Sequence, residues 1–402
     1  MATAVRSRAV SMLFPPIDPN ERFRQRRASA RRRKRLRQSA LIAVLLALVA
    51  LFGLGAQLVG GDGPDAASGD ISPAIADRTG PRPLPVEIRG VHVTLGLASL
   101  PGKLQEYVDL EREGLTAIEL DIKDENGEIG FTSRSLRLAN QVRATRDFYR
   151  PREAARLVHE RDLYLIGRIV VFEDPMLSHG RPDLAVQRSD GSVWEDGAGL
   201  GWTNPYDKRV WDYNVDIAEA AAKSGFDEIM FDYVRFPSDG DVDSAVYRNR
   251  GGLERRDAIP SFFRYAERRL ESLGVRVSAA VFGLSAVRDM GIGQVPKRIA
   301  PHVDAIYAMT YPSLFGPGEL GLADPGASPG ATVARALKRF RQQLRGSDAL
   351  LLSWVQDFSF TVPYGLEEVR AQIYSARLAG AKGYLIWNAS GVYTDGTLTP
   401  PS

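Results

Sequence analysis

The sequence predicts an α/β protein, a (β/α)8 TIM barrel preceded by a single transmembrane helix and a flexible linker. Short runs rich in β-branched residues alternate with helical patterns over residues 88–388, as expected for repeated βα units. No glycine-rich phosphate loop follows the first of these runs, which weighs against the competing fold, a doubly wound open sheet. An uncharged stretch long enough to cross a bilayer lies near the N-terminus.

Eight expected strands account for the barrel. They are 88–94, 115–122, 162–172, 226–232, 275–282, 303–310, 349–355 and 383–388. A stretch of about 300 residues suits one barrel rather than several smaller domains. We therefore expect a single barrel domain over 88–395, followed by a short C-terminal tail, 396–402.

The clearest helix between the strands is expected over 205–223. Asn204 is placed as its N-cap, Pro205 lies in the first turn, and Gly225 lies just past the end. A second clear helix is expected over 366–379.

The formal net charge of +3 is divided unevenly along the 402 residues. Residues 1–61 contain twelve basic and two acidic side chains, a net charge of +10. Residues 62–402 therefore carry a net charge of −7. The basic excess belongs to the N-terminal tail and does not indicate a nucleic-acid partner.

Residues 39–61 carry no charge, and as a helix they would span ~35 Å, enough for a hydrocarbon core of ~30 Å. Basic residues crowd the end of the preceding tail, 1–38, so we expect this tail in the cytoplasm against anionic lipid. The protein would then be a single-pass protein of the cell membrane, with its barrel outside. A cleaved signal peptide is the alternative, although the apolar run is long for one and no clear Ala-x-Ala site follows. Residues 62–87, rich in Gly, Pro, Ala and Asp, are expected to form a disordered linker.

The amino-acid composition excludes several kinds of catalytic and metal-binding site. The chain has no cysteine, which excludes disulfides, cysteine-ligated zinc and a thiol nucleophile. Its four histidines show no spacing typical of metal ligands, so we expect neither a metal nor another cofactor. We expect His92 to be a core histidine with satisfied hydrogen bonds. Carboxylates and aromatic residues follow the strands instead, as in glycosidases, where two carboxylates act as acid and as base or nucleophile.

Asp232 is the sharpest candidate, because it ends the fourth expected strand directly after an apolar run. Arg235 follows three residues later. We expect its guanidinium to hold Asp232 ionised, as a nucleophile or electrostatic stabiliser requires. The alternative is a buried Asp–Arg pair that only orders the loop.

The segment from Trp202 to Gly240 (WTNPYDKRVWDYNVDIAEAAAKSGFDEIMFDYVRFPSDG) resembles the core of a bacterial family of glycosyl-hydrolase-like TIM barrels. The FDYVRFP stretch identifies this family. GVHVT in the first strand and MTYPS in the sixth also fit its pattern, so the resemblance covers about 88–395. It implies a carbohydrate-active barrel and favours a functional role for Asp232.

A more distant resemblance differs at informative positions. FDEIMFDYV is similar to the DGxDxDxE strand of family-18 chitinases, and MTYP is similar to their MxYD. Val234 stands where those enzymes carry the acid Glu, and Pro312 stands where they carry an Asp. These departures weigh against the substrate-assisted mechanism of that family.

The sequence leaves the second catalytic carboxylate open. Asp121 and Asp357 each end an expected strand on the active face. Asp121 lies beside Lys123 and could simply pair with it, whereas aromatic neighbours of Asp357 would raise its pKa as an acid requires. Two further candidates are Glu173 and Asp174.

Six residues at or near the strand ends are expected to bind sugar through stacking or hydrogen bonds. They are Arg235, Tyr311, Trp202, Trp354, Trp387 and Asn388. For each aromatic residue, the alternative role is packing at the top of the barrel.

Taken together, these features predict a membrane-anchored, extracytoplasmic glycoside hydrolase that cleaves a cell-envelope or secreted polysaccharide. The alternative is a barrel that binds carbohydrate without turnover, which the apolar Val234 favours. A third interpretation is a scaffold whose basic tail recruits partners or lipid.

Overall fold

The computed structural model describes residues 80–360 and 362–400, and eight parallel strands form its centre. They are β1 Ile88–Val93, β2 Ala117–Lys123, β3 Tyr164–Val170, β4 Glu228–Asp232, β5 Arg276–Phe282, β6 Ala305–Met309, β7 Leu350–Gln356 and β8 Gly383–Trp387. Each strand pairs with the next along the chain, and β8 pairs with β1, so the sheet closes into a barrel. The predicted (β/α)8 fold is confirmed.

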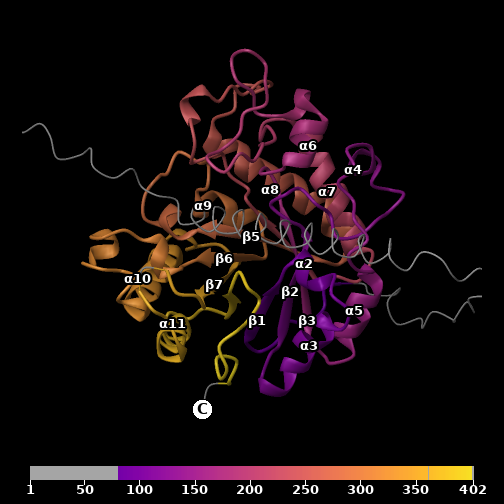
Figure 1. Cartoon of the computed structure of the whole chain (residues 1–402). Coiled ribbons are helices and arrows are strands. Elements are labelled where there is room, and N and C mark those ends of the chain that lie inside the picture. Colours follow the sequence, from indigo (N-terminus) through magenta and orange to yellow (C-terminus); the bar gives the residue numbers. More distant parts are fainter. Residues whose placement is uncertain (1–79, 361, 401–402) are drawn as a thin grey trace, which may run out of the picture. The chain divides into compact units, whose positions relative to one another are not determined.

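Helices connect the strands and lie around the outside of the barrel (Figure 1). The α-helices are α2 Leu95–Ala98, α3 Lys103–Val108, α4 Arg137–Gln141, α5 Pro151–His159, α6 Pro175–Gly180, α7 Lys208–Ala222, α8 Arg255–Leu270, α9 Pro296–Ile299, α10 Pro329–Gln343 and α11 Leu366–Leu378. The 3₁₀ turns are η2 Asp109–Glu113, η3 Pro182–Leu184, η4 Val242–Ser244, η5 Glu271–Leu273, η6 Gly283–Ala286, η7 Ala300–His302, η8 Pro312–Leu314 and η9 Glu319–Gly321. Because all strands are parallel, their carboxyl ends share one face of the barrel.

The barrel interior has a core of its own, distinct from the larger core between strands and helices. Alternate strand residues build it, because side chains two apart share a face of a strand. Its apolar members include Ile88, Ala117, Tyr164, Ile166, Met230, Ala280, Tyr307, Leu352 and Leu385. Toward the carboxyl ends of β1 to β4, the same inward positions carry His92, Asp121, Arg168 and Asp232. The change from apolar to polar side chains places the candidate site at that end.

Helix α7 begins later than the sequence predicts. Its N-cap is Asp207, whose side chain accepts a hydrogen bond from the backbone N–H of Arg209 at 3.0 Å. Asn204, the expected N-cap, instead accepts from the backbone N–H of Tyr206 and so stabilises the turn before the helix. Two side chains able to cap lie three residues apart, and the one nearer the helical run caps it. Gly225 has φ +108° and lies beyond the helix end, as expected.

Both ends of the described chain pack onto the barrel beyond the expected domain limits. Leu84 packs against the interior core, and Glu87 forms ion pairs with Arg89 and Arg377. At the other end, Leu398 is buried, and Tyr384 donates a hydrogen bond to the backbone oxygen of Thr397. The segment 80–87 therefore contacts the barrel, although the sequence places it in the linker.

The predicted transmembrane segment, 39–61, lies outside the described residues, as do the basic tail, 1–38, and residues 62–79 of the linker. Among residues 80–360 and 362–400, no helix has the length and apolar character needed to cross a bilayer.

Candidate active site

Three charged side chains lie together at the carboxyl ends of adjacent strands. Asp121 on β2 is the register partner of Arg168 on β3. Arg168 is in turn the partner of Met230 on β4, two residues before Asp232, so Asp232 shares the inward face one step nearer the rim. The three residues are only 1%, 3% and 3% exposed. Sheet register thus brings together residues far apart in the sequence.

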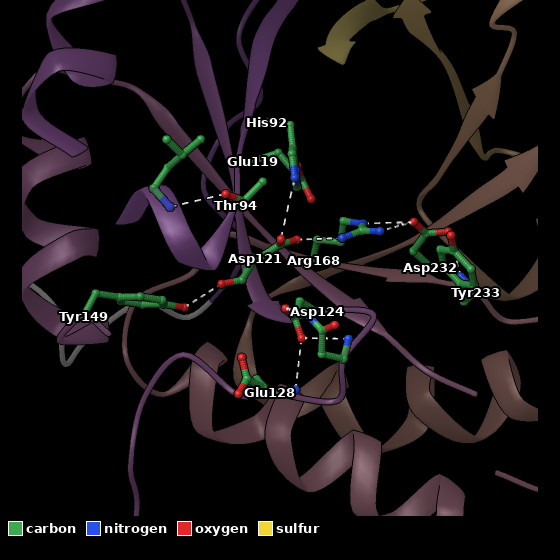
Figure 2. Close-up of polar contacts among 12 residues, drawn as sticks. His92, Thr94, Glu119, Asp121, Asp124, Glu128, Tyr149, Arg168, Asp232 and Tyr233 are labelled. Atoms are coloured by element: carbon green, nitrogen blue, oxygen red, sulfur yellow. Dashed lines mark hydrogen bonds and ion pairs between the residues drawn. The ribbon is translucent and has the colours of Figure 1, made fainter. Parts of the chain in front are cut away.

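Arg168 links the two carboxylates (Figure 2). Its Nη1 donates to Oδ1 of Asp121 at 2.7 Å, while Nε and Nη2 lie 2.9 and 2.8 Å from Oδ2 of Asp232. Charge-assisted contacts of this kind fix the orientation of both partners. The expected pairing of Arg235 with Asp232 is wrong, because the neighbouring strand β3 supplies the guanidinium instead.

Lys123 does not pair with Asp121. An ion pair with Lys123 was the alternative to a catalytic role for Asp121. A register shift in β2 separates the two positions, and the Nζ of Lys123 donates to Asp174 and to Asn214 on α7, each at 2.7 Å. Asp174 also caps α6 by accepting from the backbone N–H of Leu177 at 2.8 Å. Asp174 is therefore held in a buried structural ion pair, and Asp121 is free of Lys123.

His92 extends the polar group toward β1. Its Nδ1 hydrogen-bonds Glu119, and its Nε2 lies 3.6 Å from Oδ2 of Asp121. His92 and Glu119 are 1% and 0% exposed. The histidine is buried and hydrogen-bonded, as expected, but its partners belong to the site. The result is a continuous series of contacts from Glu119 through His92, Asp121 and Arg168 to Asp232 (Figure 2).

Burial favours the protonated form of two acids in this series, Asp121 and Glu119. Burial raises the pKa of Asp121 to about 6, with His92 and Arg168 opposing the shift. Burial also raises the pKa of Glu119 well above its ordinary value. For Arg168, burial disfavours the charge, but Asp121 and Asp232 outweigh it and raise the pKa well above the ordinary value. The charged guanidinium of Arg168 therefore contacts Asp121, a carboxyl that takes up a proton at mildly acidic pH.

Donor atoms of His92, Glu119 and Asp121 lie within 4.8 Å of one another, a spacing compatible with a metal ion. The charge of Arg168, 2.7 Å from Asp121, opposes a second cation there. The raised pKa of Glu119 likewise favours its protonated form, which is a poor metal ligand. We therefore interpret these residues as a hydrogen-bonded network that holds protons.

The backbone directly after Asp232 is strained. Tyr233 has φ +53°, a left-handed conformation that is uncommon for a residue other than glycine. Its N–H donates to Oδ1 of Asp232 at 2.7 Å, so the turn and the carboxylate hold each other. Strain of this kind clusters at functional sites.

Asp357 and Asn388 take part in a separate contact between loops. Both carboxylate oxygens of Asp357 accept from Thr394, at 2.7 Å from its N–H and 2.6 Å from its hydroxyl. Asn388 donates to the backbone oxygen of Asp357 and accepts from Ser390. Burial raises the pKa of Asp357, although the hydrogen bonds from Thr394 oppose the shift. The structure thus groups Asp121, and not Asp357, with Asp232.

The expected aromatic residues differ in how they could meet a sugar. Trp387 is partly exposed, stacks against His92 at 4.3 Å between ring centroids, and lies 5.6 Å from the guanidinium of Arg168. Trp354 packs beside it, and Tyr311 packs on Trp354, but these two residues are only 1% and 7% exposed. Trp387 is therefore the aromatic surface best placed for stacking next to the carboxylates.

Trp202 and Arg235 lie against each other rather than on Asp232. Trp202 is fully buried, donates to Asp196 at 3.1 Å, and packs 4.9 Å from the guanidinium of Arg235. The loop residue Glu173, a further candidate acid, is also buried, and its backbone pairs with that of Trp202. Trp202 therefore packs against Arg235 and does not present an exposed face for stacking.

Sequence reasoning missed the roles of Arg168 and Glu119. Both lie inside apolar strands at inward positions, and a charged residue there is the signal that could have identified them. Val234, at the position matching the chitinase Glu, is fully buried and supplies no acid there.

Residues 90–393 match the model of a protein family described as "Putative glycosyl hydrolase domain". The chain belongs to this family. The expected resemblance is thereby confirmed over nearly the whole barrel, and the strand ends described above form the mouth of a glycosyl hydrolase domain. No curated protein sequence matches the chain.

Three of the solved structures that are similar to this glycosyl hydrolase domain are compared with it by sequence identity, coverage of each chain and TM-score. A hypothetical protein from Ruminiclostridium thermocellum is 36% identical over 47% of this chain and 96% of its own, with a TM-score of 0.44. The PgaB (BpsB) glycoside hydrolase domain from Bordetella bronchiseptica is 15% identical over 76% of this chain and 95% of its own, with a TM-score of 0.53. The spore cortex-lytic enzyme SleL from Bacillus megaterium is 12% identical over 78% and 72%, with a TM-score of 0.48. The Bordetella domain shares the barrel fold with this chain.

Proposed function

We propose that the protein is a membrane-anchored, extracytoplasmic glycoside hydrolase that cleaves a cell-envelope or secreted polysaccharide through Asp232 and Asp121. The observation that carries this proposal is the contact of one guanidinium, Arg168, with both carboxylates at the mouth of the barrel. Glycoside hydrolysis requires two carboxyl groups with different roles, and these two differ in their surroundings.

Asp232 is assigned as the nucleophile or base. It accepts from Arg168 and from the backbone N–H of Tyr233, so its orientation is fixed from two sides and a countercharge is in place. Asp121 is assigned as the acid, because its pKa of about 6 lets it hold a proton at mildly acidic pH. Trp387, beside the guanidinium of Arg168 that contacts both acids, would stack on a sugar ring.

A carboxamide at Asp232 tests the assignment. Asp232→Asn is expected to lower sugar release by roughly 10⁴-fold or more, because the side chain can no longer act as nucleophile or base. The melting temperature should stay near that of the wild type, since Asn keeps an oxygen for Arg168 and Arg168 keeps Asp121. Asp183→Asn, at an exposed ion pair with Arg181, is the matched control and should retain activity. Sugar release that survives in Asp232→Asn would remove Asp232 from the mechanism.

The membrane arrangement is proposed from the sequence alone. Residues 39–61 would anchor the chain, with the basic tail, 1–38, on anionic lipid at the cytoplasmic side and the barrel outside. Protease added to intact cells should degrade a C-terminally tagged barrel while the tail stays protected, and the tag should fractionate with membranes. A mature chain that starts beyond residue 61 would establish a cleaved signal peptide instead.

A non-catalytic carbohydrate-binding barrel is the second candidate, favoured by the buried Val234 at the position of the chitinase acid. It predicts specific glycan binding with no hydrolysis by the wild type. Glycan-array binding measured beside reducing-sugar release separates the two candidates.

A further inference from the structure

Arg235 is a buried arginine whose guanidinium is held by one nitrogen only. It is 1% exposed, and its Nη1 donates to the backbone oxygen of Phe236 at 3.2 Å and to the hydroxyl of Ser238 at 3.1 Å. Its Nε and Nη2 have no hydrogen-bond partner among the described residues. Within the same part of the chain, no carboxylate oxygen lies within 4.0 Å of its nitrogens, whereas Arg168 has two acid partners.

Three aromatic rings surround the guanidinium. Its central carbon lies 4.9 Å from the ring centroid of Trp202, 5.1 Å from that of Tyr233 and 4.8 Å from that of Phe282. Each ring face attracts a cation by roughly 0.5–2 kcal/mol. The rings thus offset part of the cost of burying the charge and fix the plane of the guanidinium. They accept no strong hydrogen bond from its N–H groups.

The N–H groups without partners lie along one edge of the guanidinium. Nε–H and Nη2–H point in parallel, which is the arrangement that binds a carboxylate, sulfate or phosphate through two oxygens. A buried arginine with that edge unsatisfied carries a free-energy cost that an oxyanion would remove. The opposite edge is anchored by Phe236 and Ser238, so the binding edge is already oriented.

The position of Arg235 suits a subsite beside the carboxylates. It lies three residues after Asp232, and Phe282, which ends β5, and Tyr233 are both partly exposed. Ser238 is exposed. Two of the rings around the buried guanidinium are therefore partly exposed, and they come from the end of β5 and the loop after β4.

We propose that Arg235 is the recognition group for an anionic substituent of the glycan, a carboxylate, sulfate or phosphate, which it binds through Nε and Nη2. This inference rests on the proposed function in one respect only, which is that a carbohydrate carries the anion. It assigns the substrate to the acidic polysaccharides.

Binding measurements on the full-length chain test the proposal, with Asp232→Asn present throughout to prevent turnover. The probes are an oligosaccharide containing glucuronic acid, the same oligosaccharide with its carboxyl groups reduced to alcohols, and sulfated and phosphorylated derivatives of the reduced form. Titration calorimetry gives Kd for each. We expect at least one anionic form to bind roughly ten- to a hundredfold more tightly than the reduced form. The form that does so identifies the anion.

Substitutions then assign the preference to Arg235. Arg235→Gln should bring the anionic probe to the Kd of the reduced one, and Arg235→Lys, which keeps the charge but not the paired N–H groups, should lose about tenfold. Arg255→Gln is the matched control, because Arg255 also stacks on two rings, those of Phe236 and Tyr247, but donates to the backbone oxygen of Gly291. Its Kd values should not change.

Two results would overturn the proposal: equal binding of all probes by the protein with Arg235 intact, or equal weakening of all probes in Arg235→Gln, as a loop-ordering role predicts. The first comparison needs no substitution at Arg235, so it decides even where Arg235→Gln fails to fold. Failure of the proposed function is separate. Preference for an anion with no hydrolysis of any probe by the enzyme with Asp232 restored would refute the hydrolase alone. Hydrolysis of the reduced form at the same rate as the anionic ones would refute the anion subsite alone.

Discussion

Two buried arginines lie at the mouth of the same barrel, and their surroundings differ. Arg168 rises from inside β3 and makes ion pairs with Asp121 and Asp232. Arg235 lies in the loop after β4 among three aromatic rings, with no ion pair to any acid in the described part of the chain. Both side chains are at most 3% exposed, so solvent screens neither charge well.

This difference indicates that Arg168 and Arg235 have different roles. A buried cation whose three nitrogens already contact two acidic side chains orients those side chains rather than a ligand. A buried cation without a counterion is stabilised further only by something that enters the site. We therefore assign Arg168 to the catalytic machinery and Arg235 to substrate recognition. Each prediction below tests that division.

The largest expected effect is at Arg168. Arg168→Gln should lower kcat by roughly 10²–10³-fold or more on acidic and neutral glycans alike, because both carboxylates lose their orienting charge. The same change leaves Asp121 and Asp232 buried together without a cation, at a cost of about 3–5 kcal/mol in unfolding free energy. Steady-state kinetics and urea unfolding measure the two quantities.

Arg235→Gln is the control for this experiment, since it should spare kcat on a neutral glycan. If Arg168→Gln instead lost activity on acidic glycans only, the roles of the two arginines would be reversed.

The sequence predicts the fold better than it predicts the partners within the site. The periodicity that marks βα units is local, so β4 was expected to end at Asp232 and does. Which cation meets Asp232 depends on the register of β3 against β4, which no local pattern records. Proximity along the chain suggested Arg235, but the left-handed turn at Tyr233 separates it from the carboxylate. The register shift between Asp121 and Lys123 likewise separates these two side chains, although they are two residues apart in the sequence.

The pH dependence of activity should depend on Asp121. Because the pKa of this carboxyl is about 6, the proton needed for the leaving group is lost as pH rises through about 6. We expect kcat/KM to fall tenfold per pH unit above that value. In Asp121→Asn this alkaline limb should disappear and activity should be low throughout. An unchanged limb in Asp121→Asn would assign the acid to another carboxyl, with Asp357 next to be substituted.

The free energy of unfolding should also depend on the titration of Asp121, although the effect should be smaller than the effect on activity. A carboxyl whose pKa is raised by folding stabilises the native state fully below its unfolded pKa, near 4, and this stabilisation is lost as pH rises to about 6. The loss attributable to Asp121 is at most about 3 kcal/mol. Urea unfolding at pH 4, 5, 6 and 7 should therefore give a flatter profile for Asp121→Asn than for the wild type.

Asp124, whose pKa burial raises to about 8, contributes its own decline over the same range in both proteins, and this decline is smaller in Asp121→Asn because the charge of Asp121 adds to that rise. The comparison therefore uses the difference between the two profiles. A difference that stays constant from pH 4 to 7 would show that Asp121 titrates normally in the folded protein.

The smallest effect is expected at a tryptophan that packs beside each arginine. Trp387, partly exposed beside Arg168, should contribute to binding every glycan, so Trp387→Ala should raise KM by roughly 5- to 30-fold with kcat changed little. Tyr374, an exposed aromatic residue on α11, is the control and should tolerate Ala without change. Trp202 is fully buried against Arg235, so its loss should appear first in thermal stability and then as weaker binding of acidic glycans. If Trp387→Ala instead selectively weakened acidic glycans, recognition of the anion would extend across the mouth to Arg168, and the two arginines would share one task.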